Sequence, residues 1–337
     1  MNKQLNSYKT RLHTYRIKRA ILILLVASAA ILALCIGNTN YSPLYVIKVL
    51  LKIESKGSFT INTLRLPRML AGLAAGFALG MAGYIFQTLL RNPLASPDVI
   101  GVSAGTSTAA VFSILVLGFQ GPFVSVIAIA IGLAIAFTIY SLSKVHGHFS
   151  HIKMILIGIG FQAMLTAMTN YLLTRSAEFD VASTLQWLSG SLNGIMMDNI
   201  PWYLFSILTL FLILLMLNPN LELIILGDEL SKSLGMQLNK VFNLFIIIGV
   251  LLVALTTAIT GPIASVAFLS GPIAVRIFHN NRSNLVTAGL IGSFIVLSAD
   301  LLANNVFSVH YPVGVITGIL GAPYLILLLI TISKGRK

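Results

Sequence analysis

The sequence predicts an all-α integral membrane protein of about ten transmembrane helices. Of the 337 residues, 57% are hydrophobic and only 9% are charged, whereas a soluble domain carries about 25% charged residues. Apolar runs of roughly 17 to 25 residues recur along the chain, and each can cross about 30 Å of hydrocarbon as a helix. These runs are far too long for the strands of a membrane barrel, so helices are the expected spanning structure.

The apolar runs divide the chain into a basic N-terminal segment (1–19), a single transmembrane domain (20–332) and a short tail (333–337). Ten spans are expected at about 20–37, 68–90, 98–117, 121–143, 152–174, 201–218, 241–259, 262–279, 285–303 and 313–332. An even number of spans puts both termini on one side of the membrane. All but six of the 22 Lys and Arg residues then fall on that side, the six being Lys48, Lys52, Lys56, Arg65, Arg68 and Arg175. The positive-inside bias therefore predicts cytoplasmic termini in a multi-pass protein of the cell membrane.

Two connecting segments are predicted to carry short helices of their own. In the loop 38–64, apolar residues at near-helical spacing lie beside Lys48 and Lys52, which predicts a helix at the membrane interface. The loop 219–240 holds a polar run between Gly227 and Gly235, which predicts a short helix outside the membrane. A connector of about twenty residues that carries its own helix suggests an interaction role.

Arg65 and Arg68 lie three residues apart at the start of the second span, so they are expected to share one helical face. Arginine is costly in hydrocarbon, so the pair either anchors the helix at the lipid boundary or binds an acidic partner. Directly after them, Gly72, Gly76 and Gly80 repeat every four residues, which predicts close packing of helix backbones.

A local repeat places Gly-Pro-Ile-Ala at residues 261–264 and again at 271–274. Pro262 suits the first helical position of the eighth span. Pro272, after Gly271, falls inside that span and should kink the helix, because proline has no N–H to donate. The kink is either ordinary bending or a flexible element that transmits motion across the membrane.

The chain lacks the usual signatures of enzymes and of self-powered carriers. It contains no G-x-x-x-x-G-K-[ST] phosphate loop and no H-E-x-x-H motif. His146, His148 and His151 have metal-like spacing, but a solvated turn is favoured, and the single Cys35 cannot form an intrachain disulfide. Asp300 is the only acid in the interior of a predicted span, near its outer end. A proton-coupled carrier needs ionisable groups at mid-membrane, so the energy for any transport is expected to come from elsewhere.

Together the motifs resemble those of the FecCD-type permeases, the membrane subunits of type II ABC importers for iron-siderophores, haem and cobalamin. The resemblance covers about residues 65–328 and rests on motifs in a fixed order: Arg65-Leu66-Pro67-Arg68; Gln87 with Arg91-Asn92-Pro93-Leu94-Ala95; Asp98-Val99-Ile100-Gly101-Val102-Ser103-Ala104-Gly105; Trp187-Leu188-Ser189-Gly190-Ser191; Leu226-Gly227-Asp228-Glu229 to Leu234-Gly235; Gly261-Pro262-Ile263-Ala264; Ala299-Asp300-Leu301-Leu302; and Pro312-Val313-Gly314 to Gly321-Ala322-Pro323.

The resemblance implies three sets of functional residues. An extracytoplasmic siderophore-binding protein would dock through its glutamates on Arg65 and Arg68, with Asn304 at a third position of the same surface. A separate ATP-binding subunit, present in two copies, would seat the coupling helix formed by Gly227, Asp228, Glu229, Leu230, Ser231, Leu234 and Gly235. The pathway between two permease subunits would be lined or gated by Gln162, Met164, Thr166, Met168, Asn170, Trp187, Ser189 and Gly190.

The implied function is import of a ferric siderophore, powered by ATP hydrolysis on the separate subunit, with alternating access in the permease pair and no cofactor or metal bound by this chain. Haem and cobalamin remain open as substrates of the same importer class, and a secondary transporter is the distant alternative. The basic residues flank the membrane, and no nucleic-acid partner is expected.

The chain departs from the family pattern at three places. Asn304 stands where many members carry a third docking arginine, His310-Tyr311-Pro312 replaces the usual Glu-Leu-Pro, and Ser270-Gly271-Pro272 replaces the usual Val-Pro-His. These changes predict a second, non-identical permease subunit that keeps the features lost here.

Overall fold

The computed structural model describes residues 2–97, 101–119, 122–145, 148–176, 178–278, 282–307 and 309–334. It confirms the predicted all-helical membrane fold. The helices are α1 (Asn2–Cys35), α2 (Pro43–Leu50), the π-helical turn η1 (Phe59–Arg65), α3 (Leu66–Leu89), α4 (Val102–Leu115), α5 (Pro122–Leu142), α6 (His151–Arg175), α7 (Glu178–Leu188), the 3-10 turn η3 (Met197–Asn199), α8 (Ile200–Leu226), α9 (Asp228–Ser233), α10 (Leu238–Thr260), α11 (Val266–Phe278), α12 (Leu285–Asn305) and α13 (Val313–Lys334). Two-residue strands, β1 (Lys144–Val145) and β2 (His148–Phe149), pair antiparallel between α5 and α6.

Within the described ranges, seven helical segments are long and apolar enough to cross a membrane: His13–Cys35, Phe59–Leu89, Phe123–Leu142, Ile152–Arg175, Met197–Leu226, Leu238–Thr260 and Leu285–Asn305. Three further apolar helices, Val102–Leu115, Val266–Phe278 and Val313–Leu328, are shorter. Each falls on one of the ten apolar runs seen in the sequence. The described residues do not include 98–100 and 120–121, at the starts of the third and fourth predicted spans, or 279–281, at the end of the eighth.

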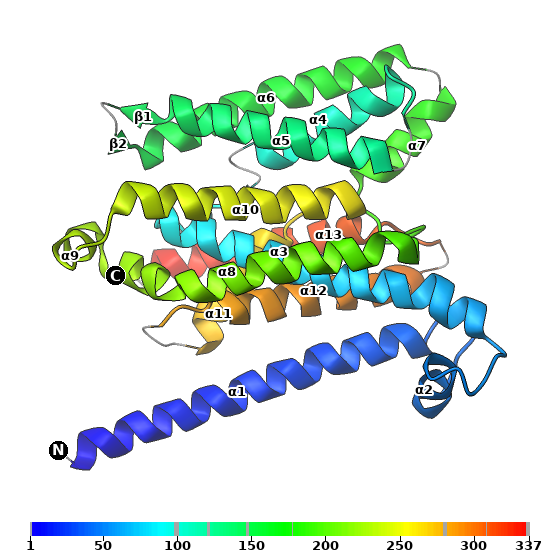
Figure 1. Cartoon of the computed structure of the whole chain (residues 1–337), viewed down its shortest axis with the longest axis horizontal. Coiled ribbons are helices and arrows are strands. Elements are labelled where there is room, and N and C mark those ends of the chain that lie inside the picture. Colours follow the sequence, from blue (N-terminus) through cyan, green and yellow to red (C-terminus); the bar gives the residue numbers. More distant parts are fainter. Residues whose placement is uncertain are drawn as a thin grey trace.

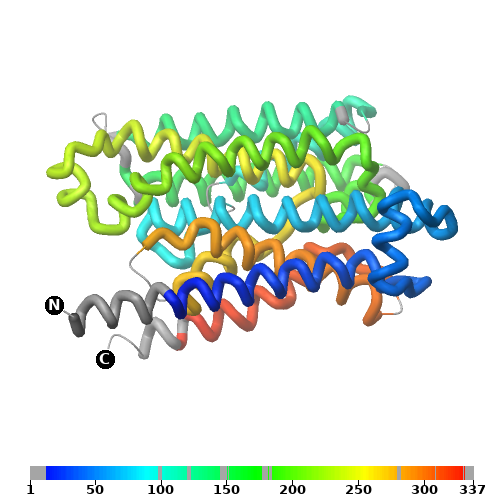
Figure 2. The backbone as a smooth tube through the Cα atoms, turned by 60° about the horizontal axis from the view of Figure 1, so that its bottom comes forward, coloured from blue at the N-terminus to red at the C-terminus, as the bar shows by residue number. Residues whose placement is uncertain are grey.

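The helices form a layered bundle around α3. In Figure 1, α4, α5 and α6 form one layer, and α3 lies in the middle layer with α8, α10, α11 and α12. Helix α1 runs along the outside of the bundle, beside α12 (Figures 1 and 2). Helix α9 and the strands β1 and β2 lie at one end of the bundle, and α2 and α7 lie at the opposite end (Figure 1). The bundle thus has two distinct ends, each with its own short helices.

The glycines of α3 allow it to pack directly against the backbone of α12, as the four-residue repeat predicts. A Cβ atom on Gly76 would overlap the backbone of Gly292 and Ser293, and one on Gly80 would overlap the carbonyl of Ala288. Small residues at this spacing bring helix axes close, so that van der Waals contact and not hydrophobic exclusion stabilises the pair within a bilayer. As a result α3 is buried along nearly its whole length.

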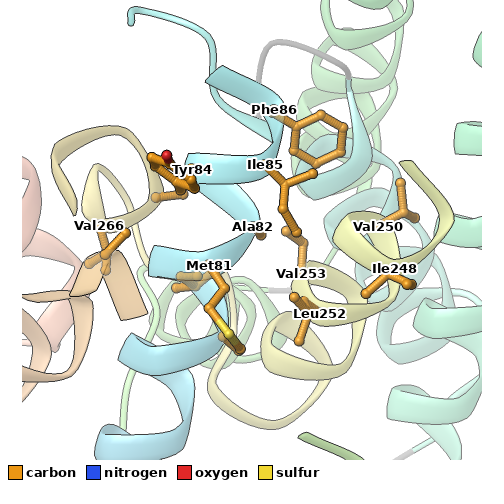
Figure 3. Packing of buried hydrophobic residues seen from close by; sticks show 14 of the residues in the cluster. Met81, Ala82, Tyr84, Ile85, Phe86, Ile248, Val250, Leu252, Val253 and Val266 are labelled. Atoms are coloured by element: carbon orange, nitrogen blue, oxygen red, sulfur yellow. The ribbon is translucent and has the colours of Figure 1, made fainter. Parts of the chain in front are cut away.

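On its other side, α3 packs larger side chains against α10 (Figure 3). Met81, Ile85 and Phe86 of α3 are fully buried, and they share a core with Leu252 and Val253 of α10. Close packing of this kind leaves little room for α3 and α10 to shift independently.

Four details differ from the expectations drawn from the sequence. Helix α1 begins at Asn2, so the basic N-terminal segment continues the first span as helix. Helix α8 continues through Pro219 to Leu226, so the segment 219–240 begins with about two turns of helix. Helix α7 had no counterpart in the prediction. Pro262 is not in a helix, because α11 begins only at Val266.

The late start of α11 has a backbone cause. Gly261 has φ +68° and Ser265 has φ +66°, and both values lie in the left-handed region that a right-handed helix excludes. The segment 261–265 is therefore irregular and not the first turn of a helix.

Candidate functional site

At the end of the bundle that carries α2, the predicted docking residues line one open cavity of about 510 Å³. Arg65 lies at the end of η1, Arg68 in the first turn of α3, and Asn304 in the last turn of α12. The cavity is also lined by Gly37, Asn38, Thr39, Thr60, Asn193, Asp300, Asn305 and His310, among others. Two regions distant in sequence, the η1–α3 junction and the end of α12, thus bring the predicted residues together.

Arg68 forms a two-pronged ion pair with Asp300 across the α3–α12 contact. Arg68 Nη2 lies 2.7 Å from Asp300 Oδ1, and Arg68 Nε lies 2.9 Å from Oδ2. The side chains are 24% and 9% exposed. Asn304 Nδ2 donates to the backbone oxygen of Asp300 at 2.6 Å. A carboxylate this buried requires a partner of opposite charge, and this fork geometry provides one.

The pairing of these two residues was not predicted from the sequence, although one signal pointed to it. Asp300 is the only acid in the interior of a predicted span, and it is predicted to lie at the same membrane face as Arg68. Charges within membrane segments are nearly always paired, so the nearest cation at that depth was the natural candidate.

Arg65 is held by the end of α1. Its Nη1 donates to the oxygen of Leu34 at 2.9 Å, and its Nη2 donates to the oxygen of Thr39 at 2.6 Å. The guanidinium lies 5.3 Å from the ring centre of Tyr41. The two arginines therefore do not present equivalent free charges: Arg65 is bound to backbone carbonyls, and Arg68 is bound to a carboxylate.

At the opposite end of the bundle, α9 is a six-residue helix between Gly227 and Gly235. Ser231 is fully buried, and its single hydroxyl hydrogen is shared between the backbone oxygens of Leu223 and Gly227, each 2.7 Å from Oγ. On the other side, Leu230 and Leu234 are 56% and 64% exposed. Helix α9 thus uses one buried hydroxyl for attachment and presents an apolar surface outward.

Arg91 attaches α9 to the end of α3. Its Nη2 lies 2.6 Å from Asp228 Oδ1, at the first residue of α9. Arg91 itself has φ +49°, a left-handed conformation that turns the chain sharply after α3. Glu229, the next acid of α9, is exposed. Arg91 and Asp228 both belong to motifs seen in the sequence, but their contact was not predicted.

The predicted pathway residues of α6 lie on a helix that is largely uncovered in this chain. Met164, Thr166, Met168 and Asn170 are exposed, and Gln162 is half-buried. Gln162, Thr166 and Asn170 follow one another every four residues, so they line one face of the helix. Gly160, two residues before Gln162, has open space beside it.

The other predicted gate residues lie at a separate backbone junction, at the end of α7. Gly190 has φ +68°, and a Cβ there would overlap the oxygen of Pro262. Ser191 N donates to Thr260 O at 2.7 Å, and Gly314 N, at the start of α13, donates to Gly190 O at 3.0 Å. The structure thus joins Gly190 to Pro262, two residues that were predicted separately.

Trp187 lines a second cavity, of about 740 Å³, near this junction. The cavity is bounded by the ends of α4, α5, α7, α8 and α10, with Trp202, Asn193, Asn199 and Ser125 among its lining residues. Ser189, beside Trp187, donates its Oγ to Leu185 O at 2.7 Å and so closes the last turn of α7. The polar residues of α6 do not line this cavity.

The predicted kink residues meet a side chain of α3. Pro272 lies inside α11, and Gln87 Nε2 donates to Phe268 O at 3.0 Å. A Cβ on Gly271 would overlap Gln87 Oε1, so this glycine makes room for the amide. The motif residues Asp98, Val99 and Ile100, and His146 of the histidine group, lie outside the described residues.

Comparison with known proteins assigns these features to one family. The model of the FecCD transport family matches residues 17–331. The ferric enterobactin transport system permease protein of Escherichia coli (strain K12) is 33% identical over 83% of this chain and 84% of its own length. An Fe(3+)-citrate import system permease protein of Bacillus subtilis (strain 168) is 33% identical over 94% of this chain and 97% of its own length.

The fold also has a solved counterpart. An ABC transporter assigned to the metal-chelate type, solved in an inward-facing conformation, superposes with a TM-score of 0.81 at 26% identity, covering 92% of this chain and 97% of the other. Relatives in the family include permeases named for siderophores, citrate, hydroxamates and cobalamin.

Proposed function

The chain belongs to the FecCD transport family of ABC importer permeases, and from this premise we propose that it carries a ferric siderophore across the cell membrane. Relatives named for ferric enterobactin and ferric citrate, each 33% identical over most of both chains, support iron chelates as the cargo. The energy comes from ATP hydrolysed on a separate subunit, since this chain contains no phosphate-binding loop.

In the proposed orientation, the cavity around Arg65 and Arg68 faces the outside and receives an extracytoplasmic binding protein. Two observations favour this surface. Both arginines line the same open cavity. Within the described residues, Arg68 donates to Asp300 from Nε and Nη2 but not from Nη1. The Nη1 donors of Arg68 remain for a glutamate of the partner, as a charge-assisted hydrogen bond. Asn304 holds the backbone of Asp300 and thereby supports this arrangement.

At the other end, we place α9 and both termini in the cytoplasm, with α9 seated in a groove of the ATP-binding subunit. The exposed Leu230 and Leu234 suit an apolar groove, and Glu229 suits a cation at its rim. Two copies of the ATP-binding subunit would serve two permease subunits, one α9 each.

The second permease subunit would pack along α6. A row of polar side chains at Gln162, Thr166 and Asn170 is costly against lipid, so this face is better placed against a partner or a water-filled pathway. We propose that the partner is a non-identical permease, because Asn304 and His310 leave this docking cavity with fewer charges than the family pattern. A fully active complex built from this permease alone would contradict the non-identical pair.

Uptake of radioactive iron tests the cargo. Cells lacking this chain, with and without the restored gene, would be given iron bound to hydroxamate, catecholate or citrate ligands. The expected result is loss and rescue of uptake with one ligand class. Unchanged uptake of every iron chelate, together with lost uptake of haem or cobalamin, would overturn the ferric-siderophore proposal and leave the importer class in place.

Docking is tested by reversing the two charges. Arg65→Glu with Arg68→Glu should weaken binding of the extracytoplasmic protein at least about tenfold, because glutamates of the partner would meet acidic side chains instead of arginines. Arg68 is also paired with Asp300, so retained assembly with the ATP-binding subunit is the check that the variant still folds. Arg175→Glu, which changes a cation on the same predicted side outside this cavity, serves as the matched control. Equal binding by the double variant and by the control would contradict the docking assignment.

A further inference from the structure

One buried contact links the bend of α11 to the end of α3. Because Pro272 has no N–H, the oxygen of Phe268, four residues earlier in α11, lacks its helical donor. Gln87 Nε2 supplies a donor to this oxygen at 3.0 Å. Gln87 is buried, so water cannot readily replace it, and an unsatisfied buried carbonyl is costly.

The surroundings of Gln87 are shaped to hold its amide in this place. A Cβ on Gly271 would overlap Gln87 Oε1, so only glycine leaves space for the side chain beside the bend. One turn earlier in α3, a Cβ on Gly83 would overlap the oxygen of Ala267, which means that the backbones of α3 and α11 touch there. Gln87 therefore reaches α11 from a fixed distance and in a fixed direction.

The same end of α3 is joined to α9. The backbone oxygen of Gln87 accepts a hydrogen bond from Asn92 N at 3.1 Å, which closes the turn after α3. This turn holds Arg91 in its left-handed conformation and directs its guanidinium to Asp228 of α9, 2.6 Å away. The segment from Gln87 to Arg91 thus makes both contacts: the side chain of Gln87 binds the Phe268 oxygen of α11, and the side chain of Arg91 pairs with Asp228, the first residue of α9.

We propose that Gln87 is a positioning residue that ties the bend of α11 to the position of α9. The proposal rests on the proposed function, in which the ATP-binding subunit moves α9. When α9 moves, Arg91 and the end of α3 move with it. The Gln87 amide then displaces α11 at Phe268, where Pro272 interrupts the helical hydrogen bonding. Without this amide, α11 would bend independently of α9, and ATP hydrolysis would be less strictly linked to transport.

A double-mutant cycle on the purified full chain tests the contact itself. Gln87→Leu keeps the approximate volume of the side chain but removes the donor, and it should lower the thermal unfolding midpoint by about 2–6 °C. Pro272→Ala restores an N–H donor to Phe268 O. In that background Gln87→Leu should therefore lower the thermal unfolding midpoint much less. An equal loss in both backgrounds would show that Gln87 does not serve the carbonyl freed by Pro272, and it would overturn the proposal.

The coupling role is tested in proteoliposomes that contain the chain with its permease partner, ATP-binding subunit and binding protein. Gln87→Leu should raise the number of ATP molecules hydrolysed per substrate imported by about threefold to tenfold, the factor that corresponds to one lost hydrogen bond. Thr88→Ala is the matched control, because the Thr88 hydroxyl donates only within its own helix, to Tyr84 O at 2.8 Å. A merely structural defect would reduce the amount of complex and both rates together, and an unchanged ratio would contradict the proposal.

The two tests separate this proposal from the proposed function. If the wild-type complex imports no ferric chelate, the cargo assignment fails, whereas the stability cycle still decides whether Gln87 serves α11. If import is normal but the cycle is additive, the cargo stands and the link through Gln87 is wrong.

Discussion

Arg68 meets its counter-charge on a helix more than two hundred residues away in the chain. Its pair with Asp300 joins the first turn of α3 to the last turns of α12, with three hydrogen bonds at 2.7, 2.9 and 3.2 Å. A local pattern can identify Arg68 as unusual, because arginine is rare in membrane helices and is nearly always paired there. It cannot identify the partner, because that depends on how α3 and α12 pack.

Removing only one member of this pair should be more harmful than removing both. Asp300→Ala would leave Arg68 without its partner and should destabilise the chain by about 3 kcal/mol, the typical cost of breaking a buried pair. Arg68→Ala with Asp300→Ala should cost less than the sum of the single changes. Thermal unfolding of the purified variants measures this difference, and strictly additive losses would mean that the two charges do not interact.

At the scale of single elements, length and hydropathy identify the spans because the bilayer imposes both. The ends of the elements follow other physics. The left-handed residues Gly261 and Ser265 delay the start of α11, and Gly261 lies against the backbone of Trp187 and Gly190, a contact that local sequence does not reveal. Helix α7 was missed because its sequence, Glu178–Leu188, mixes polar and apolar residues without a span-like run.

Helix α9 shows how much a composition argument can predict. The glycines at 227 and 235 predict its bounds, because φ of +114° and +85° ends a helix on either side. Which face of α9 is attached and which is presented could not be predicted, since that depends on the burial of Ser231 between α8 and the helix itself.

We therefore expect the exposed apolar face of α9 to control assembly. Leu230→Asp with Leu234→Asp should reduce binding of the ATP-binding subunit at least about tenfold, because two charges would enter an apolar groove. Pull-down of the ATP-binding subunit with the tagged permease measures this. Lys232→Asp, which changes an exposed residue of the same helix, is the control, and equal assembly by the double variant and the control would contradict the assigned face.

The contact between α3 and α12 gives a second prediction at this scale. Gly80→Leu should separate the two helices, because even a Cβ at this position would overlap Ala288 O, and overpacking of this kind costs about 1–3 kcal/mol or more. The measurement is the thermal midpoint of the variant beside that of Gly118→Leu in a loop, where the added side chain meets open space but φ is +66°. A larger loss for Gly118→Leu than for Gly80→Leu would refute the packing role.

At the scale of the whole molecule, burial is uneven. Helices α3, α10 and α12 are mostly covered within this chain, whereas α1, α6 and α8 are mostly uncovered. The exposed side chains of α1 and α8, such as Leu24 and Phe205, are apolar, so these helices can face lipid directly. For α6, with its polar row, lipid is a poor neighbour, which is why we assign that face to a second subunit.

This assignment predicts a specific cross-link. A cysteine at Thr166 on α6 should cross-link to the second permease subunit in assembled complexes, whereas one at Phe205 on α8 should not. The native Cys35 is buried and should not interfere. Cross-linking from both positions at equal yield, or from Phe205 alone, would place the subunit boundary elsewhere.

Helix α3 has one further consequence. Its 24 residues span roughly 36 Å at 1.5 Å per residue, with Arg68 near one end and the Gln87–Arg91 turn at the other. A molecule that competes with Asp300 for Arg68 would therefore disturb the helix whose other end is paired with α9. In the orientation that we propose, an antibody fragment or small inhibitor directed at the α3–α12 cavity would inhibit transport from outside the cell, without crossing the membrane.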